Sequence, residues 1–124
     1  MAATTLQSAL DDYGPAAWLI TVGEDGPHTS NVTAELRGET VTCALGNSAR
    51  RNVVTRPNVS LLWPPREPGG YGIILNGRAE IEGERNGSAI ARIVLTKSVF
   101  HRPGPKPEGG TGPCQSDCVA LTRS

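Results

Sequence analysis

Apolar and polar positions in the first half of the chain fall into short blocks that are typical of half-buried β-strands. Residues 16–23, AAWLITVG, form a continuous apolar run that ends at the turn sequence EDGP. Residues 28–36, HTSNVTAEL, and residues 40–45, TVTCAL, then alternate and are rich in Thr and Val, with a turn at 37–39 between them. Strands this short and this closely spaced predict an antiparallel meander.

Two segments follow the helical period instead. Residues 4–13, TTLQSALDDY, place their apolar side chains on one face, a threonine at the start can cap them, and Gly14-Pro15 ends them. Residues 48–56 predict a second short helix, with Ser48 in the N-cap position and Pro57 as the stop. We therefore expect one helix at the N-terminus and one in the middle of the chain.

The second half predicts further strands. Residues 58–63, NVSLLW, form one, and residues 88–101 begin with some helical character before continuing as another. In residues 71–83, Asn76-Gly77 is compatible with a hairpin turn or with a glycine bulge in one curved strand. The apolar residues keep the same parity across the glycine, which favours the curved strand. Residues 119–122, VALT, can add an edge strand.

The order of these elements predicts a mainly β fold, an antiparallel barrel of about six strands with two helices. The chain has 124 residues, which suits one domain. We assign residues 1–102 to this domain and residues 103–124 to a C-terminal tail rich in Pro and Gly. A small barrel of this kind commonly buries further apolar surface against a second copy, so we expect a homodimer.

Composition narrows the classes of partner. The 12 basic and 12 acidic residues give no net charge, and aromatic residues make up 4% of the chain. Both values argue against a protein that binds nucleic acid or an anionic lipid surface. No stretch of apolar residues is long enough to span a membrane, and the acidic N-terminus is unlike a signal peptide, so we expect a cytoplasmic protein.

The chain offers little catalytic chemistry of its own. We predict no catalytic residue and no metal site, since nucleophile motifs, metal-ligand clusters and glycine-rich nucleotide loops are missing from the sequence. His28 and His101 are predicted to be surface or hydrogen-bonded residues. Cys43 lies in an alternating run and predicts a buried side chain. Cys114 and Cys118 form a C-x-x-x-C pair, for which a redox pair and half of a metal site both stay open.

One motif does suggest a ligand. Gly46-Asn47 follows a predicted strand, Ser48 begins a helix, and Arg50 and Arg51 lie in its first turns. Free N–H groups at a helix start, the helix dipole and guanidinium groups together bind phosphate well. The alternative is an exposed helix with ordinary surface arginines, and the pattern alone does not decide between the two.

A resemblance to a known family favours the hypothesis that this segment binds a ligand. The stretch DGPHTSNVTAELRGETVTCALGNSARRNVVTRPNVSLLW resembles the pyridoxamine 5′-phosphate oxidase-like family of split β-barrels, which includes flavin- and deazaflavin-dependent oxidoreductases. The shared frame is G-x-P-H at the second strand, a third strand, a Ser/Arg-rich segment ending in Arg-Asn, and RPNVSLLW at the next strand. The following LLWPPREPGGYGIILNGRAEIEG is similar to short actinobacterial members, and the resemblance covers residues 16–101.

This resemblance implies a six-stranded antiparallel split β-barrel that forms a homodimer, with FMN or F420 at the subunit interface. It assigns the cofactor phosphate to Ser48, Arg50 and Arg51. The residues that would line the ring are Ser30, Asn31, Val32, Thr33, Leu45, Gly46 and Asn47. Arg78 and Trp63 are candidates to reach the partner's site.

The leading hypothesis is therefore an oxidoreductase that uses FMN or F420 to transfer hydride to a small organic substrate, with the cofactor carrying the chemistry. The first alternative is a protein of the same fold that stores or senses a flavin or haem without turnover. The second is a small-barrel adaptor for nucleic acid or protein without a cofactor, which the charge and composition disfavour.

Overall fold

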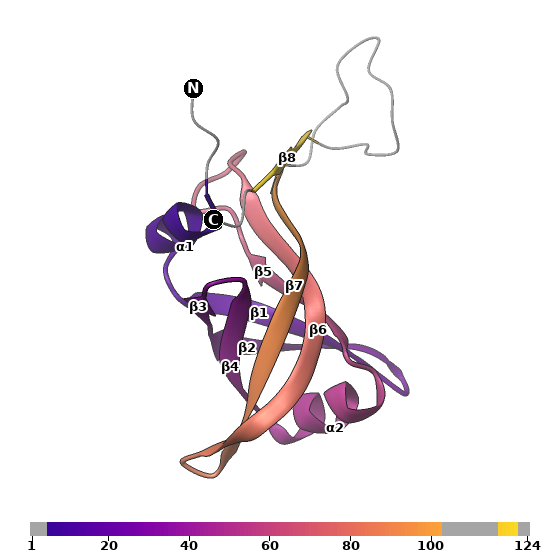
Figure 1. Ribbon diagram of the computed structural model, residues 1–124. Helices are drawn as coiled ribbons and strands as arrows, with labels where there is room; N and C mark the ends of the chain where they lie inside the picture. The colour runs from indigo at the N-terminus through magenta and orange to yellow at the C-terminus, as the bar shows by residue number, and fades with distance from the viewer. Residues whose placement is uncertain (1–4, 103–116, 122–124) are drawn as a thin grey trace.

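The computed structural model describes residues 5–102 and 117–121, and Figure 1 shows its arrangement. The described residues form two helices and eight strands. In chain order these are α1 (Leu6–Tyr13), β1 (Ala16–Gly23), β2 (Gly26–Thr33), β3 (Glu35–Arg37), β4 (Thr40–Leu45), α2 (Asn47–Thr55), β5 (Asn58–Trp63), β6 (Gly72–Arg85), β7 (Ser88–Arg102) and β8 (Asp117–Ala120). Within this described part, no helix is long and apolar enough to cross a membrane.

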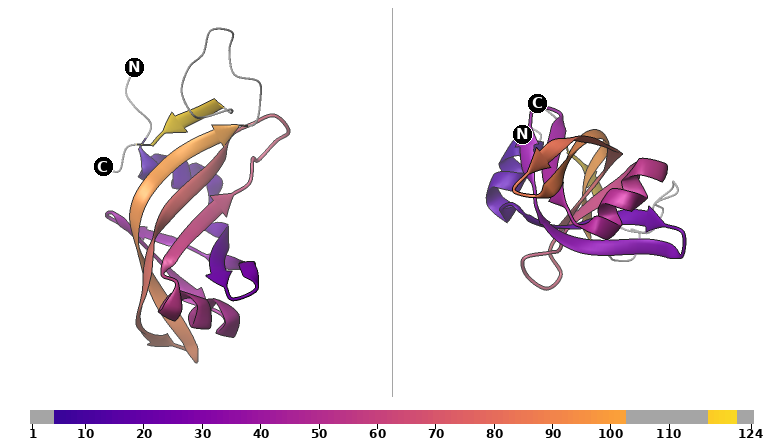
Figure 2. Two further views of the ribbon diagram at one scale, coloured as in Figure 1. Left: turned by 90° about the vertical axis from the view of Figure 1, so that its right-hand side faces the viewer. Right: turned by 90° about the horizontal axis from the view of Figure 1, so that it is seen from below.

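The strands form one curved antiparallel sheet in the order β2-β1-β5-β6-β7-β4-β3, with β8 paired to the end of β7. β2 also contacts β4 although no strand pairing joins the two in the described residues, so the sheet closes on itself incompletely. The two further views show the sheet wrapped around its core, with α2 at one end (Figure 2). The predicted fold class is confirmed. The short strands β3 and β8 raise the number of strands above the expected six.

The predicted N-terminal helix is confirmed. The side chain of Thr5 caps α1 by accepting a hydrogen bond from the backbone N–H of Ser8 at 3.1 Å. Gly14 ends the helix at φ 83°, a left-handed conformation that glycine adopts readily, and its N–H donates to the carbonyl of Leu10 at 2.8 Å. The apolar face, Leu6, Ala9 and Leu10, is buried against the sheet.

The mid-chain helix starts earlier than the sequence predicted. Gly46, in extended conformation, is the N-cap of α2, and the helix begins at Asn47. The prediction of Ser48 as N-cap is therefore wrong. Gly46 directly follows β4 and keeps its extended backbone, so the helix starts at the next residue. The Ser48 hydroxyl is inside the helix and accepts a weak hydrogen bond from Arg51 Nη2 at 3.4 Å. The helix ends at Thr55, with Arg56 as its C-cap, before Pro57 as expected.

The ambiguous segment around Gly77 is one long curved strand, which confirms the favoured alternative. β6 pairs with β7 along its whole length, with register shifts at Asn76/Gly77 and at Ile81/Gly83. At the first shift Thr96 of β7 is the extra residue, and its Oγ1 donates to the carbonyl of Asn76 at 3.2 Å. β7 is a strand from Ser88 onwards, so the helical character expected at its start is wrong.

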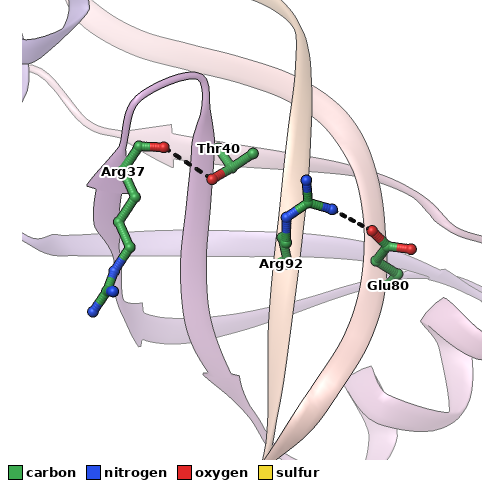
Figure 3. Close-up of polar contacts among 4 residues, drawn as sticks. All are labelled: Arg37, Thr40, Glu80 and Arg92. Atoms are coloured by element: carbon green, nitrogen blue, oxygen red, sulfur yellow. Dashed lines mark hydrogen bonds and ion pairs between the residues drawn. The ribbon is translucent and has the colours of Figure 1, made fainter.

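Two polar contacts on the outer surface of the sheet are shown in Figure 3, one at the β3–β4 turn and one between the neighbouring strands β6 and β7. Thr40 Oγ1 donates to the carbonyl of Arg37 at 3.0 Å across the β3–β4 turn, and Arg92 of β7 pairs with Glu80 of β6. Three glutamates of β6, Glu80, Glu82 and Glu84, are exposed. The register shift at Ile81/Gly83 interrupts the alternation between Glu80 and Glu84, and Glu84 lies beside Arg50 of α2.

Cys43 is buried in the barrel core, as the sequence predicted. Burial raises the pKa of its thiol to about 11, so the group is neutral at physiological pH and acts as a small apolar side chain. The side chains of Cys114 and Cys118 lie outside the described residues, and the two alternatives for them stay predictions.

Trp63 is buried in the core at the end of β5 and does not lie on a surface that a partner can reach. Its side chain is 2% exposed, and its Nε1–H donates to the carbonyl of Gly14 at 2.8 Å. The hypothesis that Trp63 reaches a partner's site is therefore wrong. The indole instead links β5 to the end of α1.

We expect Trp63→Phe to lower the free energy of unfolding by about 2 kcal/mol, because it leaves the Gly14 carbonyl unpaired and opens a cavity. The measurement is urea denaturation followed by circular dichroism. Trp18→Phe is the matched control, because Trp18 is 40% exposed. Equal stabilities of the two variants would contradict the role given to the Trp63 hydrogen bond.

Candidate functional site

One end of the barrel carries an open groove between α2 and the β1–β2 turn. Its volume is about 1140 Å³. We call it the α2 groove, and it is lined by Gly23, Glu24, Asp25, Gly26, Pro27, His28, Asn47, Ser48, Arg50, Arg51, Asn52, Val54, Thr55 and Arg56. The tip of the β1–β2 hairpin lies beside α2 in Figure 1, so two segments distant in sequence form its two walls.

The first turn of α2 presents free backbone donors at this groove. The first intrahelical bond runs from the N–H of Arg50 to the carbonyl of Gly46 at 2.9 Å. No side chain caps the helix start in the described structure, and its first turn has no acidic residue. The N–H groups of residues 47–49 therefore point outward without a helical partner, at the positive end of the helix dipole.

Three guanidinium groups line the α2 groove, those of Arg50, Arg51 and Arg56. Arg50 Nη2 lies 3.7 Å from a carboxylate oxygen of Glu84, which belongs to the β6–β7 hairpin. Both side chains of this pair are more than half exposed, so the pair is weak and a ligand can replace it. Arg51 Nη2 lies 3.4 Å from the Ser48 hydroxyl. The side chains of Arg50 and Arg51 can therefore turn toward an anion at the start of α2.

His28 and Ser30 lie on the inward-facing side of β2, one on the groove wall and one further along the strand. The Nδ1 atom of His28 and the Oγ atom of Ser30 are buried, and neither has a hydrogen-bond partner in the described structure. Buried polar atoms normally have a partner, so two such atoms on one strand face indicate that a ligand or water supplies it.

Asn52 fixes α2 against the barrel behind the groove. Its Nδ2 donates to the Oγ1 of Thr21, which is fully buried on β1, at 3.0 Å. A Cβ atom at Gly23 would lie 3.1 Å from Asn52 Oδ1, so glycine at this position lets β1 pass close to the helix. Together with buried Ala49 and Val53, this contact sets the side of α2 that faces the groove.

The structure brings only part of the predicted site together. Asn47, Ser48, Arg50 and Arg51 line the α2 groove, and Gly46 is the adjacent N-cap. The other predicted residues, which were assigned to the ring, do not line this groove: Val32 and Leu45 are buried in the core, Ser30 is half-buried, and Asn31 and Thr33 are exposed. Their contact with a ring stays a prediction.

Sequence reasoning missed the opposite wall of the groove. Residues 24–27 were predicted as a plain turn after a strand that ends at Gly23, and Arg56 only as the last residue of the helix before Pro57. The β1–β2 register, in which Thr21 pairs with His28, places this turn beside α2. The adjacent Glu24-Asp25 pair was the available signal in the sequence, but a helix 23 residues later cannot be placed against it from periodicity.

Solved structures define the class of fold. A Clostridium acetobutylicum protein of the pyridoxinephosphate oxidase family, related to general stress protein 26, has a TM-score of 0.63 and is 12% identical, over 77% of this chain and 85% of that one. A protein named F420 reductase has a TM-score of 0.56 and is 17% identical, over 67% of this chain and 87% of that one. HutZ, a haem storage protein from Vibrio cholerae, has a TM-score of 0.58 and is 14% identical, over 76% of this chain and 92% of that one. The chain has the pyridoxamine 5′-phosphate oxidase-like split-barrel fold, as its sequence indicated.

Two sequence relatives identify the family more narrowly. The uncharacterized proteins Mb0449c of Mycobacterium bovis and MT0457 of Mycobacterium tuberculosis are each 33% identical to this chain over 133 residues, covering 94% of it and 92% of their own length. The chain belongs to the same family as these mycobacterial proteins. No protein-family model matches it.

Proposed function

We propose that this protein binds the phosphate of FMN or F420 in the α2 groove and transfers hydride between the cofactor ring and a small organic substrate. The observation that carries the proposal is the uncapped start of α2, which lies in one groove with three arginines. A flavin-type cofactor also agrees with the fold, whose solved members include a protein named F420 reductase.

The residues of the groove fit the anionic part of such a cofactor. The N–H groups of residues 47–49 and the Ser48 hydroxyl would donate to phosphate oxygens, while Arg50 and Arg51 add charge-assisted hydrogen bonds. His28 Nδ1, buried without a partner in the described structure, would gain one from the ligand. When bound, the ring supplies the hydride chemistry, and the chain holds and orients it.

The test begins with the small molecule that copurifies with the full-length protein, identified by absorbance and mass. The protein is then assayed for hydride transfer with reduced F420 and with reduced FMN on a panel of quinones and enones. Turnover with either cofactor supports the proposal. Tight binding of a flavin or haem without turnover would favour the storage or sensor alternative, toward which the similarity to HutZ points. Absence of all binding would contradict both.

We also propose that the protein forms a homodimer through the outer face of β1, β5, β6 and β7. On this face Trp18, Leu62, Ile74 and Val99 lie side by side, since each pairs with the next in register across the four strands. Trp18 is 40% exposed and the other three are half-buried, which makes a continuous apolar row on the barrel surface. Such rows commonly mark contacts between proteins.

The expected effect of Trp18→Glu is a loss of self-association, because a carboxylate would have to be buried against the partner's apolar row. Sedimentation equilibrium at micromolar concentration measures the mass. Ile81→Glu is the matched control, because Ile81 is 36% exposed but lies nearer the β6–β7 turn, and this variant is expected to remain a dimer. A monomeric parent protein would contradict the homodimer.

A further inference from the structure

Glu84 is positioned by the sheet itself against the start of α2. In the β6–β7 ladder Glu84 pairs with Ala89, and in the β4–β7 ladder Ala89 pairs with Leu45. Leu45 immediately precedes Gly46, the N-cap of α2. The register of β6, β7 and β4 therefore fixes Glu84 two strands away from the residue that precedes α2. Figure 1 shows the β6–β7 hairpin beside α2. Its contact with Arg50 follows from this arrangement.

The charges of the α2 groove nearly cancel. Three arginines and two carboxylates, those of Glu24 and Asp25, line it, which leaves one positive charge with His28 counted as neutral. Glu84, paired with Arg50 from outside the lining, offsets that remaining charge. A ligand with two negative charges on one phosphate would face a site that is not charged strongly enough to neutralise it.

We propose that Glu84 sets the charge of the anion that the α2 groove accepts, favouring a phosphodiester over a terminal phosphate monoester. The inference rests on the proposed function, because it takes the start of α2 as the phosphate site. A diester carries one negative charge, whereas a monoester carries close to two above pH 7. When phosphate displaces Glu84 from Arg50, the carboxylate stays nearby and repels the ligand in proportion to the ligand's charge. The monoester is therefore penalised more than the diester.

This selection gives the pair a role that a simple surface ion pair lacks. Exposed pairs such as Arg50–Glu84 contribute little to stability, so removing the carboxylate should leave the fold unchanged. Its effect is expected in binding, and the effect should differ between the two phosphate classes. Salt should weaken the difference, because exposed charges are screened at high ionic strength.

The test compares FMN, a monoester, with riboflavin 4′,5′-cyclic phosphate, a diester with the same ring, and repeats both with 5-deaza rings. Binding to the full-length protein at pH 8 is followed by fluorescence. We expect the parent to bind the diester about fivefold more tightly. Glu84→Gln should tighten the monoester about fivefold and the diester about twofold, so that the preference narrows, and 1 M NaCl should reduce both changes.

Glu82→Gln is the matched control, since Glu82 is exposed on the same strand two residues away and should change neither affinity. Preference of the parent for the monoester, or equal effects of Glu84→Gln on both ligands, would overturn the role of Glu84 while leaving the phosphate site standing. Failure of every ligand to bind, or binding that Arg50→Glu does not affect, would overturn the site and this inference together.

Discussion

Gly77→Ala is expected to lower the free energy of unfolding by about 3 kcal/mol. Gly77 is buried on β6 next to the first register shift, where the paired strand β7 runs close beside it. A Cβ atom there would lie 2.5 Å from the carbonyl oxygen of Val94 and 2.7 Å from Ile93 Cγ2. The nearer atom belongs to backbone held in the β-ladder, so relief requires the two longest strands to separate.

Gly83→Ala provides the matched control for this prediction. Gly83 lies at the second register shift of the same strand, but a Cβ atom there would meet nothing within 4 Å. Its replacement should change stability by less than about 0.5 kcal/mol. Urea denaturation with unchanged m-values measures both variants. Comparable losses in the two would mean that glycine is needed at these bulges for its flexibility and not for space.

Arg50→Glu is expected to weaken cofactor binding at least about 100-fold while the protein stays folded. The change removes the charge-assisted hydrogen bonds to phosphate and places a carboxylate at the start of α2. It also puts two carboxylates near each other, because Glu84 lies beside position 50. The side chain is more than half exposed, so the fold does not depend on it.

Fluorescence titration with FMN and F420 measures this loss. Arg37→Glu makes the same charge change on β3, at an exposed side chain outside the α2 groove lining, and should leave the affinity unchanged. Thermal unfolding of both variants checks the fold. Retention of parental affinity in Arg50→Glu would show that the phosphate is held elsewhere.

Local sequence patterns predicted much of the barrel because its strands and helices obey local rules. The cap of α1 at Thr5, the end of α2 before Pro57, and the parity of apolar residues across Gly77 each follow from neighbouring residues. The start of α2 was misplaced because Ser48 is a better capping residue than Gly46 by type alone. The extended conformation that β4 imposes on Gly46 decides the position instead.

The candidate site could be predicted only in part for a similar reason. Arg50, Arg51 and Ser48 lie in one continuous segment, so the pattern shows them together. The opposite wall, Gly23 to His28, and the carboxylate of Glu84 reach the helix through strand register, which depends on the whole sheet. No periodicity within 124 residues specifies such distant neighbours.

The central claim is that the backbone at the start of α2 holds the phosphate of a ring cofactor. Two-dimensional ¹H–¹⁵N NMR of the full-length protein, titrated with FMN and with F420, tests it most directly. We predict that the largest downfield amide shifts fall on Asn47, Ser48 and Ala49, and that riboflavin, which has no phosphate, does not reproduce them. Amides of α2 that stay unmoved while residues elsewhere shift would contradict the account.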